Sequence, residues 1–235
     1  MAERFAVTGP FSRAAALVHV LLGVEVLLLL TAGPGLLLLV LLDRDAGNLP
    51  LAALGALPAG PALSAALYAL HHRSLDLTDL HPAAAFRRGY RRNARGVLPI
   101  WSAWLIWITV LAADLSHLES SGLPGWWRVP LLAVAAVATL GMVNALVVTS
   151  LFAFPVRDVV RLAAMFLVRA PGAAVGNACV LFLAALAGSA VVLLGSVALL
   201  AILFNSRRLI DVVREEFTSD AQDPLRRRLQ PGTVA

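Results

Sequence analysis

The last apolar block of this chain covers 33 positions, residues 172–204, and contains no charged residue. Four further apolar blocks precede it, at residues 14–42, 49–70, 97–113 and 129–154. A helix needs about 17 to 25 apolar residues to cross the hydrocarbon core of a bilayer, which is about 30 Å thick. Blocks of this length predict membrane spans, and this prediction limits the possible folds more than any other feature of the sequence.

The composition agrees with a membrane-embedded chain. Hydrophobic residues make up 60% of the 235 positions and charged residues 14%, whereas about 25% of the residues in soluble domains are charged. The single cysteine, Cys179, excludes an intramolecular disulfide and a cysteine-based metal cluster. The sequence contains no phosphate-binding loop, no serine-hydrolase or zinc-protease signature and no dinucleotide-binding glycine motif. We therefore expect a protein that is not an enzyme and needs no cofactor or metal.

The placement of arginine predicts the orientation of the spans. Of the 19 arginines, 17 lie before the first block, between the second and third, between the fourth and fifth, or after the fifth. Only Arg44 and Arg128 lie in the other two connections. Cytoplasmic connections carry the excess of positive charge, so we expect both termini in the cytoplasm of a bacterial plasma membrane. The last block must then cross twice, or enter and return near Gly188 and Ser189.

These observations predict an all-α polytopic membrane helix bundle of about six spans, with five as the fallback. Two amphipathic helices are expected at its cytoplasmic interface. Residues 1–217 would form the membrane-embedded domain. Residues 218–235 are polar and contain two prolines, so we expect them to form a disordered cytoplasmic tail.

Two segments carry a resemblance to a known family. Ala-Gly-Pro-Ala at residues 59–62 leads into Ala-Ala-Leu-Tyr at residues 65–68, and residues 85–93 read Ala-Phe-Arg-Arg-Gly-Tyr-Arg-Arg-Asn. The first pattern resembles the end of an early span in the YesL-like family, bacterial integral membrane proteins with a domain of unknown function. The second is similar to a cytoplasmic segment of that family. The family-motif residues in the first pattern are Gly60, Pro61 and Tyr68.

Two further matches, at residues 154–171 and 205–208, extend the resemblance over much of the chain. The chain departs from the family by a Gly-Pro-Gly at residues 33–35 and by a long linker at residues 43–48. Such proteins are commonly encoded beside oligosaccharide importers and glycan-degrading enzymes. The resemblance therefore implies an accessory role in sugar uptake, with subunits of an ABC-type importer as partners.

The segment after the second block is the main candidate for a functional surface. Thr78 or Asp79 can cap a helix that begins at Pro82 and continues to residue 95, and a second amphipathic helix is expected at residues 156–168 with a pair between Asp158 and Arg161. These helices could bind anionic lipid or a cytoplasmic partner such as a transporter ATPase. The candidate residues are Phe86, Arg87, Arg88, Tyr90, Arg91, Arg92 and Arg95 in the first helix and Arg157 and Arg161 in the second.

Polar residues inside the apolar blocks form a second group of candidates: Glu25, His19, Asn144 and Asn177. Glu25 and His19 are six residues apart and point to different sides of a helix. Glu25 could hydrogen-bond to Asn144 or Thr139 for packing alone, or it could bind a proton or a substrate. A cavity shared by Glu25, Asn144 and Asn177 would favour transport.

Two other groups of residues each allow either a ligand-binding interpretation or one without a ligand. Trp101, Trp104 and Trp107 form a ridge that could stack on sugar rings or serve packing and the membrane interface. The cluster of His71, His72, His81, Asp76 and Asp79 could bind a metal, but such solvated tracts usually do not, so we expect no metal site.

The leading functional hypothesis is a non-catalytic accessory or scaffold component of a bacterial oligosaccharide uptake system. The alternatives are a permease subunit that moves a small solute, and a membrane-bound sensor or regulator. We expect the anionic bilayer surface as a partner and no nucleic acid.

Overall fold

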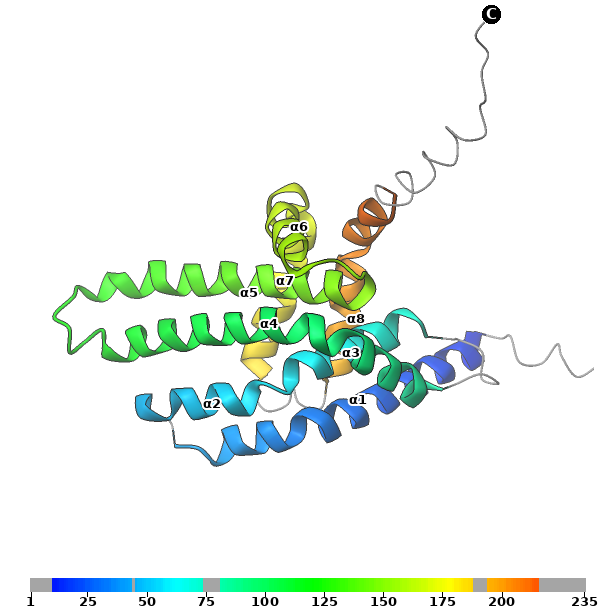
Figure 1. Cartoon of the computed structure of the whole chain (residues 1–235), viewed down its shortest axis with the longest axis horizontal. Coiled ribbons are helices and arrows are strands. Elements are labelled where there is room, and N and C mark those ends of the chain that lie inside the picture. Colours follow the sequence, from blue (N-terminus) through cyan, green and yellow to red (C-terminus); the bar gives the residue numbers. More distant parts are fainter. Residues whose placement is uncertain (1–9, 44, 74–80, 188–193, 216–235) are drawn as a thin grey trace, which may run out of the picture.

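The structure is a computed structural model that describes residues 10–43, 45–73, 81–187 and 194–215 (Figure 1). Every regular element within these ranges is a helix, which confirms the predicted all-α class. In chain order the elements are α1 (Pro10–Leu41), η1 (Ala46–Asn48), α2 (Leu49–Ala56), α3 (Ala59–His71), α4 (Pro82–His117), η3 (Gly125–Trp127), α5 (Arg128–Leu151), α6 (Val156–Arg169), α7 (Pro171–Ala187) and α8 (Gly195–Asn205). Residues 207–215 are also helical.

The described residues contain four helical stretches that are long and apolar enough to cross a bilayer. They are Phe11–Leu41, Ala46–His71, Pro82–His117 and Gly125–Leu151. A fifth span is reached if α6 and most of α7, which are bent by 99° relative to each other, are counted together. The 11 residues of α8 extend over only about 16 Å, roughly half of the hydrocarbon core. The chain is thus a multi-pass helical membrane protein.

The second apolar block is divided into α2 and α3 near Pro58, which precedes α3. Beside α2, the helix α1 continues through Pro34 without a break. A Cβ atom placed on Gly35 would lie 1.9 Å from the carbonyl oxygen of Gly55, so the backbones of α1 and α2 are in direct contact there. Small residues permit such close approach between membrane helices. The Gly-Pro-Gly at residues 33–35 therefore contains a glycine that the close approach of α2 requires.

The structure corrects the expectation of a separate surface helix at residues 82–95. This segment and the third apolar block form one continuous helix of 36 residues, α4. Pro82 lies in its first turn, where the missing N–H costs nothing. Gly89 does not interrupt the helix because it packs against the side chain of Tyr68, and Pro99 is tolerated within it. The arginine-bearing segment and the span are therefore parts of one helix about 54 Å long.

The last three helices are arranged differently from the first five. In Figure 1, α6 lies above α5 and is seen nearly end-on, so it crosses the long helices. The helices α7 and α8 are antiparallel, because Asn177 near the start of α7 contacts Asn205 at the end of α8. The last apolar block therefore returns toward its starting point, as expected. The predicted turn at residues 188 and 189 lies outside the described residues.

Packing is concentrated in one half of the bundle. In α5, all of residues 142–150 are buried, whereas none of residues 128–141 is. Almost every residue of α3 from position 60 to 70 is buried, but Gly55 is the one buried residue of α2. We call α3, residues 86–105 of α4 and residues 142–150 of α5 the packed half. The open half comprises α2, residues 106–117 of α4 and residues 128–141 of α5.

Candidate functional site

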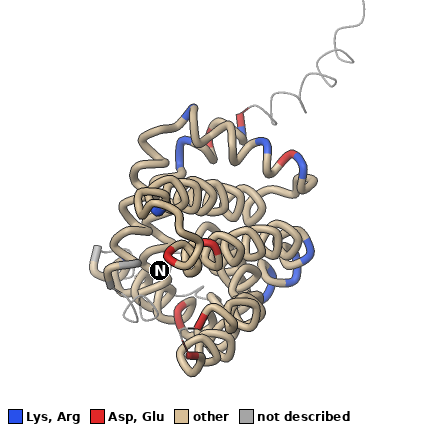
Figure 2. Tube along the Cα trace, turned by 90° about the vertical axis from the view of Figure 1, so that its left-hand side faces the viewer, with Lys and Arg blue, Asp and Glu red and all other residues tan. Residues whose placement is uncertain are grey.

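The two ends of the bundle carry opposite charges. The end of the bundle beside the packed half carries most of the arginines. They lie in the N-terminal part of α4, in α6, at position 73 and in residues 207–215. We call this the arginine-rich end. At the other end, Asp43 and Asp45 line one small cavity together with Ser116 of α4, and Asp114 and Glu119 lie nearby in the chain. Figure 2 looks along the bundle from this acidic end and shows acidic positions facing the viewer. Arg128 forms an exposed ion pair with Glu119 there.

The two sequence segments singled out above, residues 59–68 and 85–93, are in contact in the packed half. The Gly60 Cα lies against the Trp101 ring, since a Cβ atom added there would be 2.3 Å from the ring Cγ. A Cβ atom added to Gly89 would be 2.8 Å from the Cβ atom of Tyr68. The two glycines thus let α3 and α4 approach closely, and Pro61 is buried beside Gly60.

Buried hydrogen bonds connect this interface to α5. The Asn93 Nδ2 donates to the carbonyl oxygen of Ser150 at 3.0 Å. The Ser150 hydroxyl donates to the Ser64 Oγ at 2.9 Å. The Trp101 Nε1 donates to the carbonyl oxygen of Ala56 at 3.0 Å, next to the break between α2 and α3. Through Asn93 and Trp101, α4 is therefore bonded to the end of α5 and to the end of α2.

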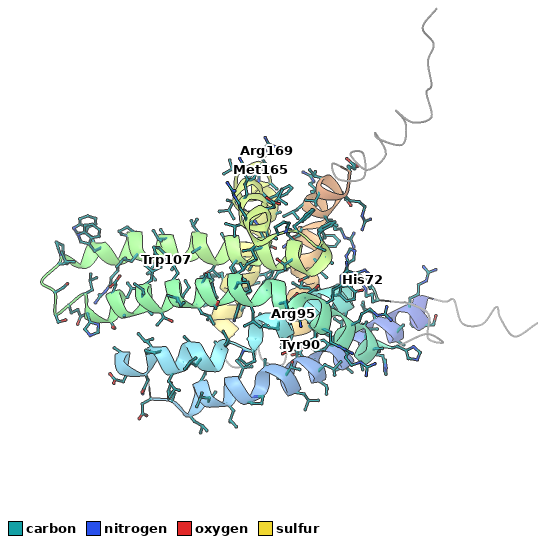
Figure 3. All side chains as sticks on the ribbon, viewed as in Figure 1. His72, Tyr90, Arg95, Trp107, Met165 and Arg169 are labelled. Atoms are coloured by element: carbon teal, nitrogen blue, oxygen red, sulfur yellow. The ribbon has the colours of Figure 1, made fainter. Side chains whose placement is uncertain are left out.

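The opposite face of α4 carries the arginines. Phe86 is buried, Gly89 and Asn93 are buried on the same face, and Tyr90 is half-buried. The exposed arginines of this segment are Arg87, Arg88, Arg91, Arg92 and Arg95. Figure 3 labels Tyr90 and Arg95 of this segment of α4. We call these five guanidinium groups the arginine face of α4; they stand on a helix that the buried face holds in place.

The helix α6 is divided in the same way. Val159, Ala163 and Phe166 are buried, whereas Arg157 and Arg161 are exposed. The bounds of α6, Val156–Arg169, agree with the predicted helix at residues 156–168. The expected ion pair between Asp158 and Arg161 does not occur among the ion pairs of the described residues, because both side chains are exposed and gain little from pairing.

The structure corrects the expected partner of Glu25. Its Oε2 accepts a hydrogen bond of 2.6 Å from the backbone N–H of Ser196, in the first turn of α8. The Thr139 hydroxyl donates instead to the carbonyl oxygen of Ala135. The first N–H groups of a helix have no partner within the helix, so a carboxylate oxygen is well placed at the start of α8. Glu25 is 7% exposed, and its Oε1 is buried without a hydrogen-bond partner in the described part of the chain.

The other intramembrane polar candidates lie apart from Glu25. His19 is exposed on the outer side of α1, and Asn144 is buried within α5. The Asn177 Oδ1 accepts from the Asn205 Nδ2 at 3.4 Å, and the Asn177 Nδ2 is 3.5 Å from the Ser206 Oγ. Glu25 contacts the start of α8 and Asn177 its end. Neither they nor Asn144 line any of the four cavities described in this section.

The tryptophan ridge has one buried and one exposed end. Trp101 is 6% exposed, and its ring centroid lies 4.8 Å from that of Trp104. The Trp104 Nε1 is buried without a hydrogen-bond partner, whereas Trp107 is 51% exposed on the open half. Of the alternatives that the sequence left open for the ridge, Trp101 thus serves packing between helices, because Gly60 leaves room for its ring.

The histidine cluster is only partly described, because Asp76 and Asp79 lie outside the described residues. His72 stacks on Tyr68 with 4.1 Å between the ring centroids, and its Nδ1 lies 3.0 Å from the Tyr68 carbonyl oxygen. Within the described part of the chain, no group of three or more histidine, cysteine or acidic side chains is placed to hold a metal ion.

A basic cavity of about 470 Å³ lies at the arginine-rich end and was not predicted from the sequence. It lies between the end of α3 and the helical residues 207–215, and His71, Arg73, Arg207, Asp211 and Arg214 line it together with four apolar side chains. In the sequence analysis, Arg207 was included only as part of residues 205–208, Asn-Ser-Arg-Arg, to which the resemblance extends. Because 134 positions separate Arg73 from Arg207, no local pattern could indicate that they meet.

Two larger cavities lie at the same end. One, of about 690 Å³, is lined by Leu27 and Thr31 of α1 and by residues 81–84, 86, 87 and 90 near the start of α4. The other, of about 720 Å³, lies between the junction of α6 and α7 and residues 204–212. The cavity at the acidic end has about 310 Å³.

Comparisons with protein-family models, with curated proteins and with solved structures give no match to this chain.

Proposed function

We propose that this protein is a non-catalytic accessory or scaffold component of a bacterial oligosaccharide uptake system of the ABC type. The observation that carries the scaffold role is the arginine face of α4. Five exposed guanidinium groups stand on a helix whose other face is buried and hydrogen-bonded to α5. A surface held in one position by the bundle is suited to docking, because little conformational entropy is lost when a partner binds. The sugar-uptake context is supported by the resemblance to the YesL-like family.

The intramembrane polar groups favour a scaffold over a permease. A solute path needs polar groups that converge on a cavity, but Glu25 contacts the start of α8 and Asn177 contacts its end. Such polar contacts between helices are a common device for holding membrane bundles together. A permease that moves a small solute and a membrane-bound sensor remain the alternatives that the test below would reveal.

The proposal includes an orientation in the bacterial plasma membrane, with both termini and the arginine-rich end in the cytoplasm. The excess of arginine in the connections at this end supports it. Six spans are proposed, with five as the fallback, and α6 is proposed as an amphipathic helix at the cytoplasmic interface. Cysteine labelling at positions 12, 121 and 219, in a Cys179→Ala background, tests this topology. Labelling of position 219 from outside intact cells would contradict the six-span orientation.

The functional test is affinity purification of the full chain in mild detergent, followed by identification of co-purified proteins. We expect subunits of an ABC-type sugar importer with the parent protein. Replacement of Arg88, Arg91, Arg92 and Arg95 by glutamine should abolish this association without loss of abundance, because the spans hold the protein in the membrane. Recovery of the parent protein without importer subunits would contradict the scaffold role.

A lysine variant at the same four positions separates docking from binding to lipid. Lysine preserves the charge that a diffuse anionic surface attracts, but it cannot form the forked, two-point contacts that guanidinium groups make with carboxylates. Failure of both variants would support docking to a protein partner. Full recovery with lysine would mean that the arginine face serves the lipid surface instead.

A further inference from the structure

The basic cavity at the end of α3 is lined by a cation, Arg73, that forms no ion pair with the described residues. The Arg73 Nη1 donates to the carbonyl oxygen of Leu70 at 2.5 Å, while its Nε is buried and has no hydrogen-bond partner among the residues that the structure describes. Burial and the neighbouring Arg207 guanidinium lower the pKa of Arg73 below its usual value. Both effects penalise the positive charge of Arg73, so an anion in the cavity would relieve them.

The other charged groups of the cavity leave room for such an anion. The Arg207 guanidinium lies 4.3 Å from the centroid of the Phe204 ring, which holds its plane in position. Asp211 is the one carboxylate among the lining residues, and the described residues include no ion pair between it and Arg73, Arg207 or Arg214. Three guanidinium groups against one carboxylate leave a net charge of +2 with His71 neutral. This charge matches a phosphate monoester, which carries about −1.5 to −2 at pH 7.

The rest of the lining indicates what carries the phosphate group. Leu200, Leu203, Phe204 and Ile210 form an apolar wall beside the guanidinium groups. A lining that is cationic on one side and apolar on the other fits an amphiphile, and basic pockets between membrane helices commonly bind the head groups of anionic lipids. Guanidinium groups are also well suited to phosphate, because their forked donors match its oxygens.

We propose that Arg73, Arg207 and Arg214 form a binding site for a phosphate monoester, carried by an anionic phospholipid whose acyl region lies against the apolar wall. This site is separate from the arginine face of α4, and its occupation does not depend on an uptake system.

The experiment uses the full chain in nanodiscs of phosphatidylcholine, with phosphatidic acid as the probe. Native mass spectrometry after release from the nanodisc measures how much phosphatidic acid stays bound as its fraction in the bilayer increases. The parent should retain a single phosphatidic acid. Arg207→Gln with Arg214→Gln should weaken retention by about 30-fold, since each arginine near an anionic lipid contributes about one kcal/mol. Arg73 is left intact because it also bonds to the α3 backbone.

The matched control removes the same charge at Arg208 and Arg13. Arg208 follows Arg207 directly but lines a different cavity, and Arg13 lies exposed near the start of α1. The control should retain phosphatidic acid like the parent. Equal losses in the control and the test variant would overturn the proposal in favour of a diffuse surface charge. Unchanged retention in the test variant would overturn it outright.

A competition arm identifies the source of the phosphate. Glycerol 3-phosphate and inorganic phosphate carry the same anion without acyl chains. If they fail to displace phosphatidic acid at matched concentration, the lipid is the ligand. If glycerol 3-phosphate displaces it equally well, and does so only with Arg207 and Arg214 present, the phosphate site is supported and the lipid carrier is overturned.

Discussion

The packed half and the open half of this bundle contain the same apolar residue types but differ in how these residues are packed. In the packed half, glycines let helices touch, and buried polar groups bond to one another across α3, α4 and α5. In the open half, large side chains such as Trp107, Val134 and Val137 are exposed from the bundle and suit contact with lipid tails. Lipid is as apolar as leucine, so hydrophobicity alone does not hold membrane helices together. Close packing and hydrogen bonds must do so, and apart from the contact between Gly35 and Gly55 of α2 they lie mainly in the packed half, where the arginines are presented.

The largest difference between the halves is expected for added methyl groups. Gly60→Ala would place a Cβ atom 2.3 Å from the Cγ atom of Trp101 and should destabilise the protein by about 1–3 kcal/mol. Gly141→Ala meets no atom within 4 Å and should be neutral or stabilising, because alanine favours helices by up to about 1 kcal/mol. Denaturant unfolding in mixed micelles measures both. Equal effects would show that packing does not differ between the two regions.

The contact of Glu25 with α8 extends the packed half to the last helices. Glu25→Leu removes the acceptor of the Ser196 N–H and should destabilise the protein by about 1–3 kcal/mol. Glu25→Gln keeps a carbonyl oxygen at this place, so its loss should be clearly smaller. The same unfolding measurement compares the two variants. If glutamine is as damaging as leucine, the carboxylate has a role beyond accepting this hydrogen bond.

A smaller effect is expected for the two ends of the tryptophan ridge. Trp101→Phe removes the hydrogen bond to the Ala56 carbonyl oxygen and should cost about 0.6–1.7 kcal/mol, the range for polar contacts between membrane helices. Trp107→Phe, on the open half, should leave the unfolding free energy nearly unchanged. A larger loss for Trp107 than for Trp101 would reverse the proposed distribution of packing.

The smallest effect concerns the ion pair at the acidic end. Glu119→Gln breaks the exposed pair with Arg128 and should change the unfolding free energy by about 0.5 kcal/mol or less, as for most exposed pairs. Raising the salt concentration should remove even this difference between parent and variant. A larger loss would place a structural contact in the region that we describe as open.

The sequence allowed the prediction of features that depend on neighbouring residues. The run of apolar residues predicted α1, and the alternation of arginine with buried positions predicted the exposed face of α4 and the bounds of α6. It failed where the outcome depended on distant partners. The helix predicted to end at residue 95 continues to His117, and its Gly89 packs against Tyr68 of α3. Glu25 bonds to a residue 171 positions away, and the basic cavity joins similarly distant segments.

The continuity of α4 fixes the direction in which its arginines point. Successive residues of an α-helix are turned by about 100° around its axis. The orientation of the span around the helix axis therefore also sets the orientation of the arginine face. One residue inserted near Gly96 would swing this face by about 100° around the helix, while the charge and length of the segment would hardly change. Seven inserted residues would return it almost to its original direction and carry it about 10 Å further from the membrane.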